Sequence, residues 1–282
     1  MSDKIDDTLC YSVGSAYLSG LPVVVAVYQM KYKGFLSKFD FMERAIKNAQ
    51  MNPEDIAILM DSDTVFTGVD IHPFLNRFIA QSAATPEELD ALAVRQDRAM
   101  APIVVSAEAG CWAPNILHGW PEWIARFNSI NVKVQRYTAA HPEHKLVSSF
   151  NLSSQRYINA DVVIARVLAY KELVKKADNL TKTQPTKYKP EKRWSCDQSV
   201  LTALYLNLLM WEVEQDFFSL SLHERQTARS TYGVRAGFMD LDYANELSAP
   251  RTIFLMRLTV MHDKDWAKYC HCMKLRTHTQ KR

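Results

Sequence analysis

The sequence lacks three features that would place a chain in a special class: long apolar runs, a strong excess of one charge, and paired cysteines. The apolar stretch at residues 21–28 is far too short to span a bilayer. Asp3, Asp6 and Asp7 precede it, where a secretion signal carries positive charge. The net charge of +3, from 34 basic and 31 acidic residues, is too balanced to argue for a nucleic-acid or membrane surface.

Cysteine usage and the N-terminal residues bear on the compartment. The five cysteines are an odd, scattered set and not a disulfide framework, although one or two bridges are compatible with it. Cys270 and Cys272 flank His271, but no second cysteine pair has the spacing of a zinc site, so we do not predict zinc. We expect a cytoplasmic or nuclear protein if the chain is complete, and a protein of the endoplasmic reticulum or Golgi lumen if a leader is missing.

Length and composition are those of an ordinary globular protein. The 282 residues, 48% of them hydrophobic, are ample for one large core or for two domains. Because we find no internal repeat and no clear linker, we predict a single domain at 22–266. It is preceded by an N-terminal extension at 1–21 and followed by a basic tail at 267–282.

Hydrophobic periodicity predicts alternating strands and helices over most of the chain. This alternation predicts an α/β fold with a mostly parallel central sheet and helices on both of its faces. Aromatic and proline-rich residues predict a loop at 111–127, and polar residues predict an exposed loop at 177–193. The expected strands are 22–29, 56–60, 102–107, 157–164, 238–241 and 253–261. The expected helices are 38–48, 72–80, 86–94 and 197–211, with a further helix that follows the strand 157–164 and ends at about 176.

Two aspartates directly follow the strand expected at 56–60. Open α/β sheets bind ligands at the carboxyl ends of their strands, which is where Asp61 and Asp63 would lie. Two carboxylates one residue apart can share a divalent cation, and Mg²⁺ and Mn²⁺ prefer oxygen ligands. The alternative is an ordinary turn or helix cap, which is a common use of this pattern.

Three sequence elements occur in a familiar order along the chain: Asp61-Ser62-Asp63-Thr64, then Ala107-Glu108 with Cys111-Trp112, then Cys196-Asp197-Gln198. As an ordered set they resemble the glycosyltransferase domain of the procollagen lysyl hydroxylase and collagen galactosyltransferase family. The resemblance covers about residues 23–262. It implies a nucleotide-diphospho-sugar transferase (GT-A type) fold and the use of Mn²⁺, or Mg²⁺, with a UDP-sugar.

The resemblance assigns a metal site with two departures from the family pattern. Asp61 matches the first aspartate of the family's metal-binding element, but Thr64 stands at the position of the second. Asp63, between them, takes over as the expected ligand. His262 fits the family's third ligand, a histidine after a late strand, although Asp263 replaces the glycine-rich stretch that usually follows it.

The resemblance also assigns donor-binding and catalytic residues. Asp197 and Gln198 match a pair near the transferred sugar and are the expected catalytic residues. Asn159 matches an asparagine near the donor sugar, although Ala160 and Asp161 replace the usual serine and glycine. The full set expected to bind the donor is Lys38, Ser62, Thr64, Glu108, Trp112 and Asn159.

The expected activity is transfer of a hexose from UDP-glucose or UDP-galactose to a hydroxyl acceptor that the sequence does not identify. Asp197 has an ordinary alternative as a helix cap, His262 as a core histidine, and Trp112 as a packing residue. Two other functions stay open. One is a binding module of the same fold that has lost catalysis, and the other is a glucosyltransferase acting on a hydroxylated nucleic-acid base.

Overall fold

The structure, a computed structural model, describes eleven stretches of the chain. They hold a four-stranded sheet, the helices on its two faces, and most of the predicted site. The described residues are 6–26, 30–66, 70–85, 87–88, 100–108, 121–143, 157–183, 194–214, 220–221, 223–224 and 237–242.

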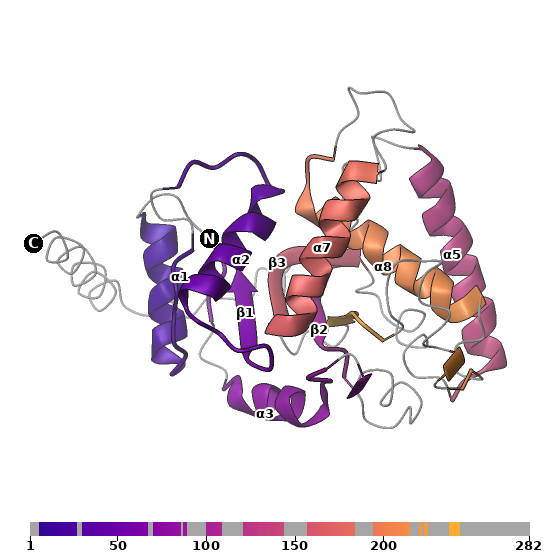
Figure 1. Ribbon diagram of the computed structural model, residues 1–282, viewed down its shortest axis with the longest axis horizontal. Coiled ribbons are helices and arrows are strands. Elements are labelled where there is room, and N and C mark those ends of the chain that lie inside the picture. Colours follow the sequence, from indigo (N-terminus) through magenta and orange to yellow (C-terminus); the bar gives the residue numbers. More distant parts are fainter. Residues whose placement is uncertain are drawn as a thin grey trace, which may run out of the picture.

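The sheet has the strand order β1-β3-β2-β4 (Figure 1). The long central strand β3 runs antiparallel to both β1 and β2, and β4 pairs parallel with β2. The prediction of a mostly parallel sheet is therefore wrong for the described strands, whereas the α/β class is confirmed. The strands are β1 (Ile56–Met60), β2 (Ile103–Glu108), β3 (Tyr157–Arg166) and β4 (Asp240–Asp242).

Helices cover both faces of the sheet, as predicted. Alternate residues of a strand point to opposite faces, so Val105 and Val163 join the main core while Val104 and Ile164 join a smaller one. The main core includes residues of α2, α5, α7 and α8, and the smaller core includes residues of α3 (Figure 1). The helices are α1 (Asp7–Leu18), α2 (Ser37–Asn48), α3 (His72–Gln81), α5 (Pro121–Ala140), α7 (Val167–Thr183) and α8 (Asp197–Glu214).

Parts of three predicted loops or extensions are helical instead, within the residues that the structure describes. The N-terminal extension contains α1, whose first turn is capped by the Asp6 carboxylate accepting from the Leu9 amide at 2.9 Å. The stretch 121–127 belongs to α5, which begins at Pro121, because proline is tolerated in the first turn of a helix. The chain continues as α7 to Thr183 because Ala177 and Leu180 extend its buried face.

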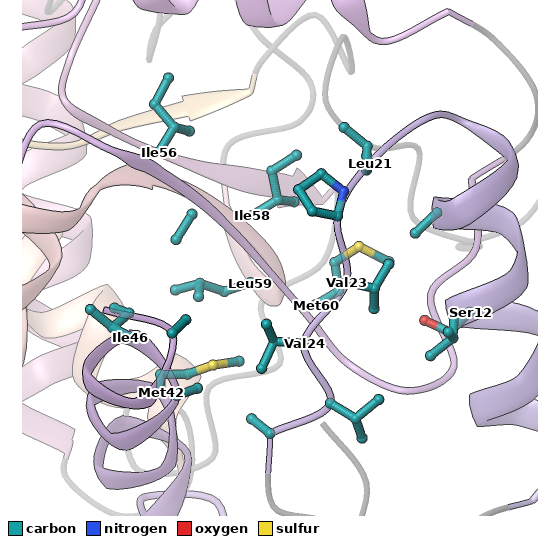
Figure 2. A pocket seen from close by; sticks show the side chains of 18 of the residues that line it. Ser12, Leu21, Val23, Val24, Met42, Ile46, Ile56, Ile58, Leu59 and Met60 are labelled. Atoms are coloured by element: carbon teal, nitrogen blue, oxygen red, sulfur yellow. The ribbon is translucent and has the colours of Figure 1, made fainter. Parts of the chain in front are cut away.

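The strand predicted at 22–29 does not form over its described part, residues 22–26. This part lies without a ladder partner and lines an apolar cavity of about 440 Å³ beside β1. Figure 2 shows side chains of residues 21–24, α2 and β1 around this cavity. Val24 remains 61% exposed, so its β-branched side chain gains little from burial there.

Several predicted segments lie wholly or partly outside the described residues: 27–29, most of 86–94, and 253–261. The strand predicted at 238–241 is confirmed as β4, displaced by one or two residues. Among the helices of the described residues, none is both long and apolar enough to cross a membrane.

Candidate functional site

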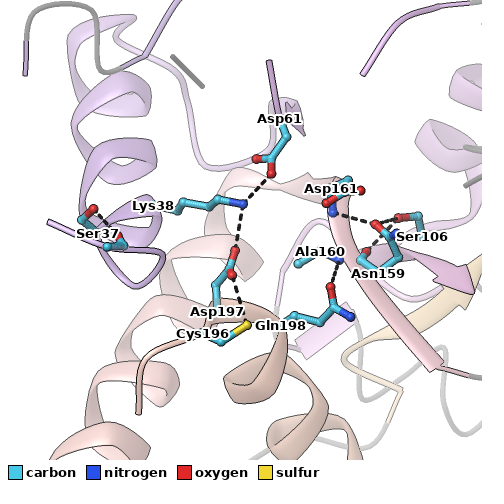
Figure 3. A network of polar contacts seen from close by, with 11 residues as sticks. Ser37, Lys38, Asp61, Ser106, Asn159, Ala160, Asp161, Cys196, Asp197 and Gln198 are labelled. Carbon is cyan, nitrogen blue, oxygen red and sulfur yellow. Dashed lines mark hydrogen bonds and ion pairs between the residues drawn. The ribbon is translucent and has the colours of Figure 1, made fainter. Parts of the chain in front are cut away.

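The predicted site residues that the structure describes gather at one edge of the sheet. Strands β1 and β2 end at this edge and β3 begins there, because Met60 pairs with Val162 and Glu108 with Tyr157. The Asp61 amide donates to the Asp161 carbonyl at 2.9 Å, which fixes the residue after β1 against β3. The first turns of α2 and α8 reach the same edge, so five segments distant in sequence meet there (Figure 3).

Lys38 lies at the centre of the site. Its ammonium contacts Asp61 Oδ2 at 2.6 Å and Asp197 Oδ2 at 3.2 Å, and it stands 5.6 Å from the centre of the Phe35 ring. Burial lowers the pKa of this ammonium, but the charges of Asp197 and Asp61 outweigh burial and leave the pKa raised. Lys38 is therefore a firmly protonated cation between two carboxylates.

Asp197 is the first residue of α8 and is 5% exposed. Burial raises the pKa of its carboxyl, while the Lys38 charge and the Gln198 amide oppose that effect. The position at a helix N-terminus also favours a negative charge. The ordinary capping role and the predicted functional role are thus both compatible with this place, because one Asp197 oxygen faces Lys38.

A second polar network joins β2, β3 and α8. Glu108 accepts from Gln198 Nε2 at 2.8 Å on one carboxylate oxygen and from Asn159 Nδ2 at 3.4 Å on the other. The Ala160 amide donates to Gln198 Oε1 at 3.2 Å, so the glutamine bridges Glu108 and the start of β3. Burial raises the pKa of Glu108 to about 7, although both amide donors favour its charged form. Glu108 therefore changes charge near neutral pH.

The acidic turn after β1 faces a third carboxyl group. Burial raises the pKa of Asp161, and the negative charge of Asp61 and then of Asp63 raises it further. Asp63 itself is exposed, and the Thr64 amide closes the turn by donating to the Asp61 carbonyl at 3.1 Å. Asp61 and Asp63 can offer oxygen ligands to a divalent cation, and a cation there would relieve the repulsion at Asp161.

The described residues alone do not complete a metal centre. Within the described part of the chain, His, Cys, Asp and Glu side chains form no group of three or more that is arranged to hold a metal ion. The predicted third ligand His262 and the predicted donor-binding residue Trp112 lie outside the described residues. Ser62 and Thr64 are half-buried in the turn after β1, next to the site.

Sequence reasoning missed Ser106 and treated Asp161 only as a departure from the family pattern. The Ser106 hydroxyl donates to the Asn159 carbonyl at 2.7 Å, and Asn159 Oδ1 accepts from the Asp161 amide at 2.8 Å. A signal was present, because Asn159 and Asp161 are polar residues two apart at the start of an apolar strand. That spacing places both on one face of the strand.

Comparison of the chain with protein-family models, with curated proteins and with solved structures found no match.

Proposed function

We propose that this protein is a metal-dependent glycosyltransferase of the GT-A fold that transfers glucose or galactose from a UDP-sugar to a hydroxyl acceptor. The observation that carries this proposal is the meeting of Lys38, Asp61, Glu108, Asn159 and the Asp197–Gln198 pair at one sheet edge. The family resemblance assigns all of these residues, which come from five separate segments of the chain, to one donor site. Their proximity supports the proposal, because a donor site needs its cationic, acidic and amide groups within reach of one ligand.

The acidic turn and Lys38 suit the diphosphate part of a UDP-sugar. Asp61 and Asp63, with His262, would hold Mn²⁺ or Mg²⁺. When bound, the ion would supply Lewis-acid stabilisation of the departing diphosphate. Lys38 adds a second positive charge at the same place, where negative charge develops as the sugar leaves.

The network of Glu108, Asn159 and Gln198 suits the sugar. Its amide and carboxylate groups lie next to the diphosphate side of the site and present both donors and acceptors, which sugar hydroxyls require. Asp197 contacts Lys38 and directly precedes Gln198, which belongs to this network. Its carboxylate can orient the sugar or accept the proton of the acceptor hydroxyl, the role of a general base.

The test is UDP release from UDP-glucose and from UDP-galactose, with and without Mn²⁺. We expect slow release with one donor that requires Mn²⁺, since glycosyltransferases can pass the sugar to water when the acceptor is missing. Asp61→Asn should lower the rate by about a hundredfold or more, because the variant loses an anionic ligand at the centre of the site. Asp197→Asn should lower the rate while leaving UDP binding measurable.

Asp178→Asn is the matched control. Asp178 is an exposed carboxylate on α7 that pairs with Lys182 at 2.5 Å. Like Asp61→Asn, the Asp178→Asn variant therefore removes one ion-paired aspartate. Its rate should equal that of the wild type. Binding of UDP with Mn²⁺ but no release from either donor would favour a non-catalytic binding module. No binding and no release in a folded sample would refute the proposed function.

A further inference from the structure

Lys38 stands where helix electrostatics disfavour a cation. It is the second residue of α2, and the first turn of a helix carries a partial positive charge. Its side chain is nevertheless only 13% exposed. A buried cation at this place needs anionic partners, and among the described residues Asp61 and Asp197 supply them.

The two carboxylates differ in how firmly they are held. Asp197 begins α8, where the helix N-terminus favours its charge, and its side chain is 8% exposed. Asp61 lies on the turn after β1, is 23% exposed, and makes the shorter contact with Lys38. Asp197 is therefore the permanent partner of Lys38, whereas Asp61 is open enough to exchange one cation for another.

We propose that Lys38 acts as an internal counter-ion for the Asp61 carboxylate. The ammonium breaks this ion pair when a diphosphate binds together with its metal ion. This inference rests on the proposed function. A divalent cation that approaches alone meets a carboxylate already neutralised by Lys38 and a like charge beside it. A diphosphate brings oxygens that accept both cations, so Lys38 turns to the phosphate while Asp197 continues to hold its ammonium.

The consequence is a coupling between metal and nucleotide to which Lys38 contributes. Without nucleotide, Lys38 weakens the binding of Mn²⁺ to the acidic turn. With nucleotide, Lys38 strengthens the complex because it contacts the diphosphate. By linkage, UDP raises the affinity for Mn²⁺ by the same factor by which Mn²⁺ raises the affinity for UDP.

The experiment measures Mn²⁺ affinity without nucleotide, by the loss of the free Mn²⁺ electron paramagnetic resonance signal, and UDP affinity at saturating Mn²⁺, by calorimetry. Lys38→Gln removes the charge but keeps a hydrogen-bond donor for Asp197. We expect its Mn²⁺ affinity without nucleotide to rise about tenfold, as loss of a charged hydrogen bond implies. Its UDP affinity should fall by a similar factor.

Two further variants separate this role from others. Asp197→Asn keeps Lys38 but leaves it a single anionic partner, so the ammonium should hold Asp61 more tightly and lower the Mn²⁺ affinity. This variant also serves as the test if Lys38→Gln does not fold. Lys47→Gln removes an exposed lysine from the same helix and should change neither affinity.

A Lys38→Gln protein whose Mn²⁺ affinity without nucleotide is unchanged or lower overturns the inference, even if its UDP affinity falls, because Lys38 would then be a phosphate ligand only. Failure of Mn²⁺ to bind any of these folded proteins also overturns it. Failure of UDP to bind the wild type at saturating Mn²⁺ counts against the proposed function instead, and the Mn²⁺ titrations still decide the role of Lys38.

Discussion

Glu108 should make the stability of this protein depend on pH near neutrality. Glu108 is 4% exposed, and burial raises the pKa of its carboxyl group from an ordinary 4.5 to about 7. Below about pH 4.5 the group is protonated in both the folded and the unfolded chain. Between pH 4.5 and about pH 7 the carboxyl group keeps its proton in the folded protein but loses it in the unfolded chain, so the free energy of unfolding falls as pH rises. Above pH 7 this loss of stability is complete.

The size of this effect follows from the two pKa values. Each tenfold change in proton affinity corresponds to about 1.4 kcal/mol, so a change from 4.5 to about 7 costs the folded protein at most about 3.5 kcal/mol above neutral pH. Glu108→Gln removes this titration. The variant also turns one of the two hydrogen bonds that Glu108 accepts into a donor–donor contact, which costs about 1–3 kcal/mol at every pH.

The assay is urea unfolding followed by tryptophan fluorescence at pH 5 and pH 8, for the wild type and for Glu108→Gln. Because the other titrating groups are common to both proteins, the difference between them isolates Glu108. We expect the wild type to lose up to about 3 kcal/mol relative to the variant between the two pH values. Glu172→Gln on α7, whose carboxylate pairs with Lys176 at 3.7 Å, is the control and should show little such change. A difference between wild type and Glu108→Gln that stays constant with pH would refute the reasoning.

Two further predictions concern the face of the sheet opposite the main core. Phe78 is fully buried, so Phe78→Ala should lower the free energy of unfolding by about 3–5 kcal/mol, whereas Ile79→Ser, at a neighbouring position that is 54% exposed, should change it by less than about 1 kcal/mol. Arg166 donates to the Ser82 hydroxyl and to the carbonyls of Glu54 and Ile79, at 2.7–2.9 Å, and Arg166→Met should cost about 3 kcal/mol because it leaves these acceptors unpaired. Urea unfolding at a single pH measures all three variants, and equal stability of Phe78→Ala and Ile79→Ser would contradict the packing described for α3.

Most of the described strands and helices were predictable because their patterns are local. Helices α2, α3 and α8, and strands β1, β2 and β3, follow from apolar runs and spacing within single segments. The direction of β3 was not predictable in this way. A strand that is buried on both faces has the same run of apolar residues whether it is parallel or antiparallel to its neighbours. Its direction depends on where the preceding chain returns to the sheet.

The grouping of the candidate residues was predictable from the sequence, but the network of contacts between them was not. The resemblance grouped Asp61, Glu108 and Asp197, and the structure places them at one sheet edge. The resemblance did not indicate that Lys38 joins Asp61 to Asp197. That contact depends on how the first turns of α2 and α8 meet beyond the sheet, which is a property of tertiary packing and leaves no spacing signal in either segment.

The most direct test of the central claim is paramagnetic broadening of backbone amide resonances by Mn²⁺ in the presence of UDP. If the sheet edge holds the metal–nucleotide complex, substoichiometric Mn²⁺ with UDP should erase the signals of Asp61, Ala160 and Gln198 first, and the signals of Val134 and Leu180 should persist. Removal of Mn²⁺ by a chelator should restore the lost signals. Broadening that centres elsewhere, or none in the presence of UDP, would contradict the account.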